Sequence, residues 1–174
     1  MSISLYDASV GSYLQIVESA CGVLRKGAEH CVAQERSVDE LVDCKLHETM
    51  AGLHFQVVSV VHHSLGAIKG VQEGVFAPPS GYPEMDYAGL QAFLDETLAS
   101  LRALQPEAIN ALAGGQVVFR FAGNEIPFTT ENFLLSFSLP NFYFHATTLY
   151  DVLRAQGVPL GKMDYLGRLK MARA

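Results

Sequence analysis

The stretch "LPNFYFHATTLY", residues 139–150, decides how this chain folds, because polar residues interrupt its aromatic and aliphatic run at regular intervals. Together with the preceding serine they recur in steps of three and four: Ser138, Asn141, His145 and Thr148. Such steps place side chains on one face of an α-helix, so we predict a last helix with one polar strip. Pro140 removes one backbone hydrogen bond, and we expect it to kink this helix, because the apolar pattern continues on both sides.

His145 has two interpretations at this stage. A polar strip that faces the interior needs hydrogen-bond partners, since each unpaired buried polar group costs roughly 1–3 kcal/mol. Either a bound ligand or a closed hydrogen-bond network supplies them, so His145 is a ligand-binding or catalytic group, or a satisfied core histidine. In an enzyme, His145 would be the metal ligand or the general base, because its side chain titrates near neutral pH. Asn141 and Gln56 would then orient the substrate or a bound water.

Apolar periodicity predicts three more long helices before the last one. They are expected over residues 4–32, from Met50 to Val71, and from the N-cap Asp86 to Leu101. Ser37 and Glu40 have the spacing of a capping box, which predicts a short helical turn before the second helix.

The connections between these helices differ in character. Residues 74–85, rich in glycine and proline, are predicted to form a crossover loop. The stretch "QVVFRFAGNEIPF", residues 116–128, alternates around Gly123-Asn124 and predicts a β-hairpin with five-residue arms. Thr129 or Thr130 is expected to cap the last helix, and Gly157 to end it.

The order of these elements defines the predicted fold class, which is all-α. Four long helices, one long crossover and a small hairpin before the last helix indicate a single four-helix-bundle domain over residues 1–174. In such bundles, sites are built in the interior from side chains on facing helices. Apolar residues make up 49% of the chain and charged residues only 17%, which favours a wide core or a surface hidden in an oligomer.

Composition also argues against several functional classes. The net charge is −6 and no lysine- or arginine-rich run occurs, so we expect no nucleic-acid partner. No apolar run approaches the roughly 20 residues of a membrane span, and no signal-like N-terminus is present, so we expect a cytoplasmic protein without a membrane partner. Cys21, Cys31 and Cys44 lack Cys-x-x-Cys spacing and are interpreted as plain thiols.

The second helix offers further candidates for the site: His54, Gln56 and His63. At 100° per residue all three can reach toward the interior, whereas His62 points furthest from the core and is expected at the solvent or an interface. A zinc site requires three protein ligands, commonly histidines, and Asn141 is a weak ligand. The residues alone therefore leave a metal site and a satisfied core histidine both open.

The stretch "LPNFYFHATTLYDVLRAQGVPLGKMDYLG", residues 139–167, resembles the C-terminal signature of an uncharacterised bacterial family of the DinB/YfiT-like superfamily. Proteins of that superfamily are classed as metalloenzymes. A weaker similarity covers "HETMAGLHFQVVSVVHHS", residues 47–64, and the order of the helices. The resemblance implies an up-down-down-up four-helix bundle that is frequently a homodimer.

The resemblance also implies where the site lies. Typical members of the superfamily bind a divalent ion through one histidine on the second helix and a His-x-x-x-His pair on the fourth. His145 matches the second histidine of that pair and Asn141 the first, while the second-helix ligand falls at His54 or Gln56. We therefore expect a degenerate metal or small-molecule pocket around Asn141 and His145, with Thr148 and Gln56 beside it.

Two alternatives remain from the sequence. One is a divalent-metal enzyme, of the thiol-transferase or hydrolase type, that uses His145 with His54 or His63 and binds zinc or nickel. The other is a non-catalytic dimeric binding or structural protein.

Overall fold

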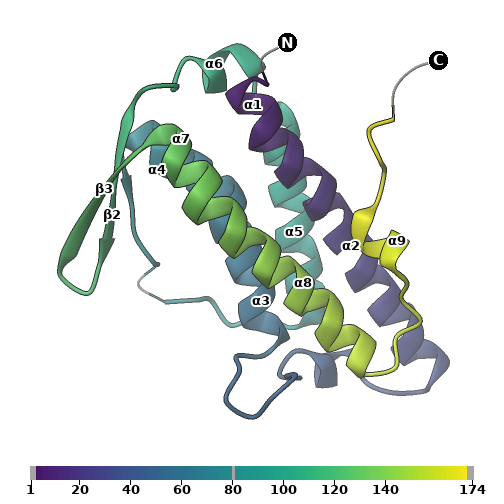
Figure 1. Ribbon diagram of the computed structural model, residues 1–174. Helices are drawn as coiled ribbons and strands as arrows, with labels where there is room; N and C mark the ends of the chain where they lie inside the picture. Colours follow the sequence, from purple (N-terminus) through teal and green to yellow (C-terminus); the bar gives the residue numbers. More distant parts are fainter. Residues whose placement is uncertain (1–2, 80, 172–174) are drawn as a thin grey trace.

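The computed structural model describes residues 3–79 and 81–171, and they are mostly helical (Figure 1). The helices are α1 (Leu5–Ala8), α2 (Val10–Ala33), α3 (Leu53–Val61), α4 (Ala67–Glu73), α5 (Tyr87–Ala103), α6 (Pro106–Asn110), α7 (Thr130–Asn132), α8 (Leu139–Ala155) and α9 (Lys162–Leu166). One 3₁₀ turn and two π-helical turns join them, namely η1 (Val38–Leu41), η2 (His62–Gly66) and η3 (Phe133–Ser138).

The predicted capping residues explain where several helices begin and end. The Asp86 carboxylate accepts a hydrogen bond from the amide of Gly89 and starts α5, and the Thr129 hydroxyl accepts one from the amide of Asn132 and starts α7. Gly157 follows α8 with φ 87°, in the left-handed region that glycine adopts without strain. These three predictions are confirmed.

The predicted capping box before the second helix does not form. The Ser37 hydroxyl makes no capping hydrogen bond at η1. The Glu40 carboxylate, which a capping box would direct to the Ser37 amide, is instead held at 3.1 Å by both Nε and Nη2 of Arg36. The short helical turn predicted here does form, as η1, but without the capping box, because the Glu40 carboxylate pairs with Arg36 instead.

Hydrogen bonds between distant segments fix how the long helices run. The Tyr87 amide donates to Asp39 Oδ1 at 2.9 Å, so α5 begins where α2 has just ended. After the other end of α5, helix α6 brings the chain back to α1, where the Tyr6 amide donates to Asn110 Oδ1 at 2.9 Å. Helix α5 is therefore antiparallel to α2 (Figure 1). Gly157, after α8, lies beside His30 near the end of α2, so α2 and α8 run in the same direction.

The core lies between these helices and is filled by large side chains. Tyr13 of α2 meets Phe142 of α8 edge to face, with ring centroids 4.9 Å apart. The largest fully buried side chains come from every long helix: Tyr13, Tyr87, Phe133, Phe142, Leu24, Leu53, Ile68, Leu90 and Leu101. In the part of the chain that the structure describes, no helix is long and apolar enough to cross a membrane.

A three-stranded sheet lies at one end of the helices, where the sequence predicts only a hairpin. Strands β2 (Gln116–Phe121) and β3 (Asn124–Thr129) pair antiparallel around Ala122 and Gly123, both with positive φ. The additional strand β1 (Val75–Phe76) pairs parallel with β2. The predicted crossover loop thus contains a strand, and the all-α class is corrected to a mostly helical fold with a small mixed sheet.

Gly70 of α4 allows β1 to approach. A Cβ at this position would lie 2.9 Å from Cδ2 of Phe76 and 3.2 Å from the carbonyl oxygen of Val75. The missing side chain lets the Phe76 ring pack directly against the helix, which brings the strand beside β2. Phe76 is consequently buried, with 4% of its surface exposed.

The two π-helical turns face each other in the middle of the fold. The Ser138 hydroxyl of η3 donates to the carbonyl oxygen of His63 in η2 at 2.7 Å. Because its single proton is used there, Ser138 Oγ accepts from the Tyr13 hydroxyl, also at 2.7 Å. We expected a kink at Pro140; Pro140 lies in the first turn of α8, and the irregular turn is η3, which ends two residues earlier. Turns of this kind occur frequently at functional sites.

Candidate functional site

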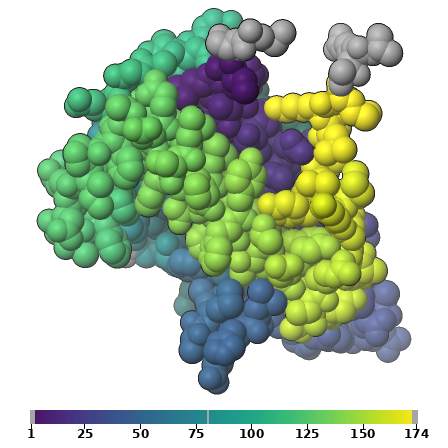
Figure 2. Space-filling model, in the orientation of Figure 1, coloured from purple at the N-terminus to yellow at the C-terminus, as the bar shows by residue number. Residues whose placement is uncertain are grey.

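A pocket of about 260 Å³ lies beside the two π-helical turns, between α3, α8 and the sheet. We call it the aromatic pocket, and its lining residues are Phe55, Ser59, His62, His63, Phe76, Pro78, Tyr82, Phe119, Phe121, Phe137, Asn141 and His145. Ligand sites in proteins share this composition, an apolar and aromatic wall with a few convergent polar groups. Figure 2 shows the sheet and the last helix next to each other on the face that it presents.

Gln56 fixes which ring nitrogen of His145 carries a proton. The Gln56 amide nitrogen donates to the carbonyl oxygen of Ala51 at 3.0 Å, so its amide oxygen is the atom that faces His145. His145 Nδ1 lies 2.8 Å from this oxygen and must therefore donate a proton to it. In the neutral ring the other nitrogen, Nε2, then keeps a lone pair. Nothing in residues 3–79 and 81–171 donates to Nε2, which leaves it as an acceptor.

His63 lies next to His145 with its ring nearly parallel, at 5.8 Å between centroids and 11° between planes. Its Nδ1 is buried and has no hydrogen-bond partner among the described residues. Burial, reinforced by the neighbouring His62 and His145, lowers the pKa of His63 to about 3. Burial lowers the pKa of His145 to about 4, with a smaller effect from His62. Both rings are therefore uncharged at neutral pH.

His62 also lines the aromatic pocket, so the prediction that it points to solvent or an interface was wrong. Its ring stacks on Phe76 at 4.3 Å between centroids and 27° between planes, and burial lowers its pKa. Two features cause the difference. The π-helical turn begins at His62 and changes the angle per residue, and strand β1 brings Phe76 over this face.

The other predicted site residues divide into two groups. Asn141 lines the pocket, and its amide nitrogen donates to the carbonyl oxygen of Phe137 at 2.7 Å. Thr148 is buried one turn further on and donates to the carbonyl oxygen of Phe144, away from the pocket lining. His54 faces another groove, where its Nε2 lies 2.9 Å from the carbonyl oxygen of Pro83. The structure thus brings Gln56, Asn141, His63 and His145 together and leaves His54 and Thr148 out.

Sequence reasoning missed the aromatic wall that the sheet and the crossover supply. Phe119 and Phe121 are two residues apart on β2, and their rings stack at 6.0 Å and 7°. The alternation of residues 116–121 gives a signal for this, because every second side chain of a strand faces the same side. Phe76 and Tyr82 lie in the predicted crossover loop, where no periodicity exists to mark them.

The residues present do not fit the metal site that the superfamily implies. Within the described ranges no three histidine, cysteine, aspartate or glutamate side chains are placed to hold a metal ion. His145 offers one lone pair, Asn141 could offer only its amide oxygen, which is a weak ligand, and His54 is turned away. The polar groups of the pocket therefore form a hydrogen-bonding set rather than a coordination set.

Comparison with known proteins identifies the fold and the family. A crystal structure of a DinB family member protein from Shewanella denitrificans superimposes with a TM-score of 0.78 over 98% of this chain and 96% of that one, at 22% sequence identity. This likeness shows that the fold is DinB-like. The family model for the domain of unknown function DUF1993 matches residues 5–166, so the chain belongs to that family. The resemblance to an uncharacterised DinB-like family is confirmed. A comparison with curated proteins gives no significant match.

Proposed function

We propose that the chain binds a small aromatic molecule carrying an O–H or N–H donor in the aromatic pocket, and that this pocket is a degenerate metal site. The observation that carries the proposal is the Gln56 amide held between Ala51 and His145, because it turns Nε2 of His145 into a hydrogen-bond acceptor. A ring placed among the phenylalanines can donate its proton to that atom. Aromatic side chains favour such a ligand through edge-to-face and offset contacts.

Binding suits His145 better than acid–base catalysis does. An effective general base has a pKa near the working pH. The pKa of His145 is about 4, so its lone pair accepts a hydrogen bond at neutral pH but takes up a full proton poorly. Neutral His62 and His63 around it also favour an uncharged ligand, because no formal charge is available in the pocket to balance one.

The proposal includes the bundle topology that the resemblance implies. We assign α2, α3–α4, α5 and α7–α8 as the four helices of an up-down-down-up bundle. The support is that α2 and α8 run in one direction, α5 runs in the other, and the long crossover of residues 74–86 separates the second helix from the third.

Phenol and anisole test the proposal by calorimetry, because in anisole a methyl group replaces the O–H proton that His145 would accept. We expect phenol to bind about tenfold more tightly than anisole, the value of roughly one good hydrogen bond. His145→Phe keeps a planar ring but removes the acceptor, so it should abolish this preference. His54→Phe, a histidine change outside the pocket, is the matched control and should keep it. Equal affinity for phenol and anisole in the wild type would contradict the proposal.

Metal analysis distinguishes a protein that binds an organic ligand from the alternative, a divalent-metal enzyme. The protein should be purified without an affinity tag or chelator and analysed for zinc and nickel. We expect no stoichiometric metal and no rise in melting temperature when either ion is added, because no three coordinating side chains converge among residues 3–79 and 81–171. One ion per chain that disappears in His145→Ala would overturn this part of the proposal.

A further inference from the structure

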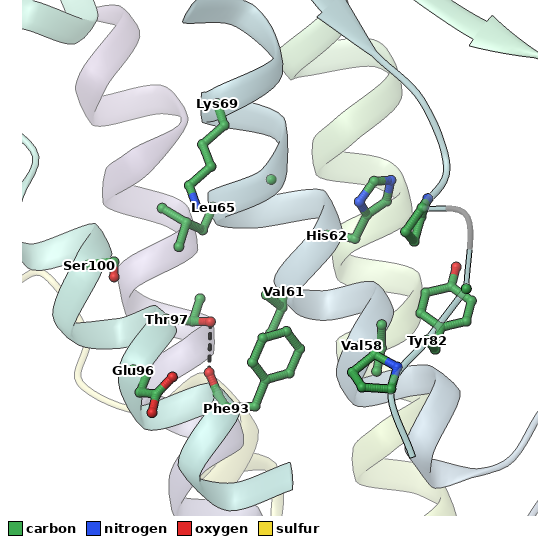
Figure 3. Close-up of a pocket in the computed structure, with 14 residues that line it drawn as sticks. Val58, Val61, His62, Leu65, Lys69, Tyr82, Phe93, Glu96, Thr97 and Ser100 are labelled. Carbon is green, nitrogen blue, oxygen red and sulfur yellow. Dashed lines mark hydrogen bonds between the residues drawn. The ribbon is translucent and has the colours of Figure 1, made fainter. Parts of the chain in front are cut away.

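A second groove, of about 390 Å³, lies on the other side of His62 and Tyr82 from the aromatic pocket. It runs between α3–α4 and α5 (Figure 3). We call it the α4–α5 groove. Its lining residues are Val58, Val61, His62, Leu65, Gly66, Lys69, Pro79, Gly81, Tyr82, Pro83, Phe93, Glu96, Thr97 and Ser100. Its volume falls within the range of roughly 300–1,000 Å³ that small-molecule sites occupy.

The groove combines an apolar floor with two charges of opposite sign. Val61 and Leu65 come from one helix and Phe93 from the other, and together they offer a surface for an apolar side chain. Lys69 on α4 and Glu96 on α5 stand at the two sides of this floor (Figure 3). A ligand that satisfies both must itself carry an anion and a cation.

Neither Lys69 nor Glu96 forms an ion pair with another residue that the structure describes. The ion pairs of the described residues join Arg25 to Asp95, Lys26 to Asp164, Arg36 to Glu40, Arg102 to Glu18 and Arg120 to Glu125. Lys69 and Glu96 belong to none of them. The Thr97 hydroxyl, by contrast, is already committed, because it donates to the carbonyl oxygen of Phe93 at 2.8 Å. Lys69 and Glu96 are therefore the side chains that can bind the charged groups of a ligand in this groove.

We propose that the α4–α5 groove binds a zwitterionic α-amino acid with an apolar side chain. Its carboxylate would pair with Lys69, its ammonium group with Glu96, and its side chain would lie on Val61, Leu65 and Phe93. The proposal uses other residues than the ligand site around His145, so either one can fail without the other.

Three related compounds test both charged contacts by calorimetry at low salt. L-Phenylalanine carries both charges, 3-phenylpropionate lacks the ammonium group and 2-phenylethylamine lacks the carboxylate. We expect L-phenylalanine to bind at least about tenfold more tightly than either of the others, because each charged hydrogen bond that is lost weakens binding by that order.

Two substitutions assign the contacts. Lys69→Gln should weaken L-phenylalanine and 3-phenylpropionate about tenfold and leave 2-phenylethylamine unchanged. Glu96→Gln should weaken L-phenylalanine and 2-phenylethylamine and leave 3-phenylpropionate unchanged. Both side chains are exposed, so both variants should fold, and circular dichroism checks this.

His145→Phe locates the bound amino acid, because it changes only the aromatic pocket. We expect this variant to bind L-phenylalanine as the wild type does. Absence of L-phenylalanine binding to the wild type would overturn the proposal. So would binding that is lost in His145→Phe but kept in Lys69→Gln and Glu96→Gln, because it would place the amino acid in the aromatic pocket instead.

Discussion

Gln56 determines the chemistry of the aromatic pocket although it contributes no charge. It is 2% exposed in the second turn of α3, and both ends of its amide are engaged. Because a backbone carbonyl can only accept, the contact with Ala51 excludes the flipped amide. The orientation of one buried amide thus determines, through His145, which ring nitrogen could accept a hydrogen bond from the proposed ligand.

Replacing Gln56 by leucine should remove the contact that fixes which ring nitrogen of His145 carries the proton. Leucine has a similar volume but cannot accept from Nδ1, so the proton is free to move to Nε2. We expect long-range ¹H–¹⁵N spectra to show His145 protonated at Nδ1 in the wild type and mainly at Nε2 in Gln56→Leu. Gln56→Leu should also bind phenol and anisole with more similar affinities, because Nε2 then no longer accepts a hydrogen bond. An Nε2-protonated ring in the wild type would contradict the assignment.

Sequence spacing placed Asn141 and His145 on one side of the last helix, and both line the pocket because α8 is regular around them. The same reasoning failed for His62 on the second helix. A π-helical turn closes its hydrogen bonds over five residues instead of four, so a fixed angle of 100° no longer applies from His62 onward. The sequence also cannot show that Phe76, from a two-residue strand, covers this histidine.

The elements η2 and η3 depend on each other through Ser138. Ser138→Ala removes the donor to the His63 carbonyl and the acceptor for the Tyr13 hydroxyl. The Tyr13 hydroxyl then loses its partner and the His63 carbonyl loses this donor, so we expect a loss of about 1–3 kcal/mol in the free energy of unfolding, measured by urea denaturation.

Ser136→Ala is the matched control. Ser136 lies in the same π-helical turn but is exposed, and its hydroxyl bonds only to the carbonyl oxygen of Asn132 within the same helix. We expect a change within about 0.5 kcal/mol for this variant. Equal losses for both variants would show that the bridge between the two turns contributes nothing of its own.

The contact of α4 with β1 leads to a second prediction about how the elements pack. Gly70→Ala places a Cβ 2.9 Å from the Phe76 ring, so either the ring or the strand must move. We expect a destabilisation of about 1–3 kcal/mol, as for other overpacked sites, together with weaker phenol binding. Gly22→Ala in α2 has 3.9 Å to its nearest neighbour and should instead stabilise by roughly 0.5–1 kcal/mol. Thermal unfolding of the two variants should therefore shift in opposite directions.

The whole molecule should lose stability as the pH falls through the titration range of its buried histidines. An unfolded histidine has a pKa near 6.5, whereas those of His63 and His145 in the fold are about 3 and about 4. Between these values the unfolded chain binds more protons than the folded one, so acid favours unfolding. The stabilisation is complete above pH 6.5 and declines as the pH approaches 4.

Urea denaturation at pH 7.0, 5.5 and 4.5 measures this decline. We expect a loss of roughly 2–4 kcal/mol for the two histidines together, after allowance for their partial exposure. The double variant His63→Phe/His145→Phe should show a shallower dependence than the wild type over the same range. An unchanged slope would contradict the lowered pKa values.

Most of the fold could be predicted because helical periodicity and caps such as Asp86 and Thr129 are local in sequence. The mixed sheet could not, because β1 is two residues long and owes its place to Gly70 and to β2. The aromatic pocket could be predicted only in part for the same reason, since five of its twelve lining residues come from the sheet and the crossover. What could be predicted of the site was its polar side, on α3 and α8.

The pairing of β1 with β2 also has a consequence for the order of folding. The Val118 amide donates to the carbonyl oxygen of Gly74 at 3.0 Å, across a long stretch of chain that includes all of α5. Contacts between residues so distant in sequence form late, because a large loop must close first. We infer that the aromatic wall is completed only after the local hydrogen bonds within the helices have formed. Refolding followed by pulsed hydrogen exchange should therefore protect the Val118 amide later than the helical amides of α2, and the proposed ligand should bind only once this strand pairing has formed.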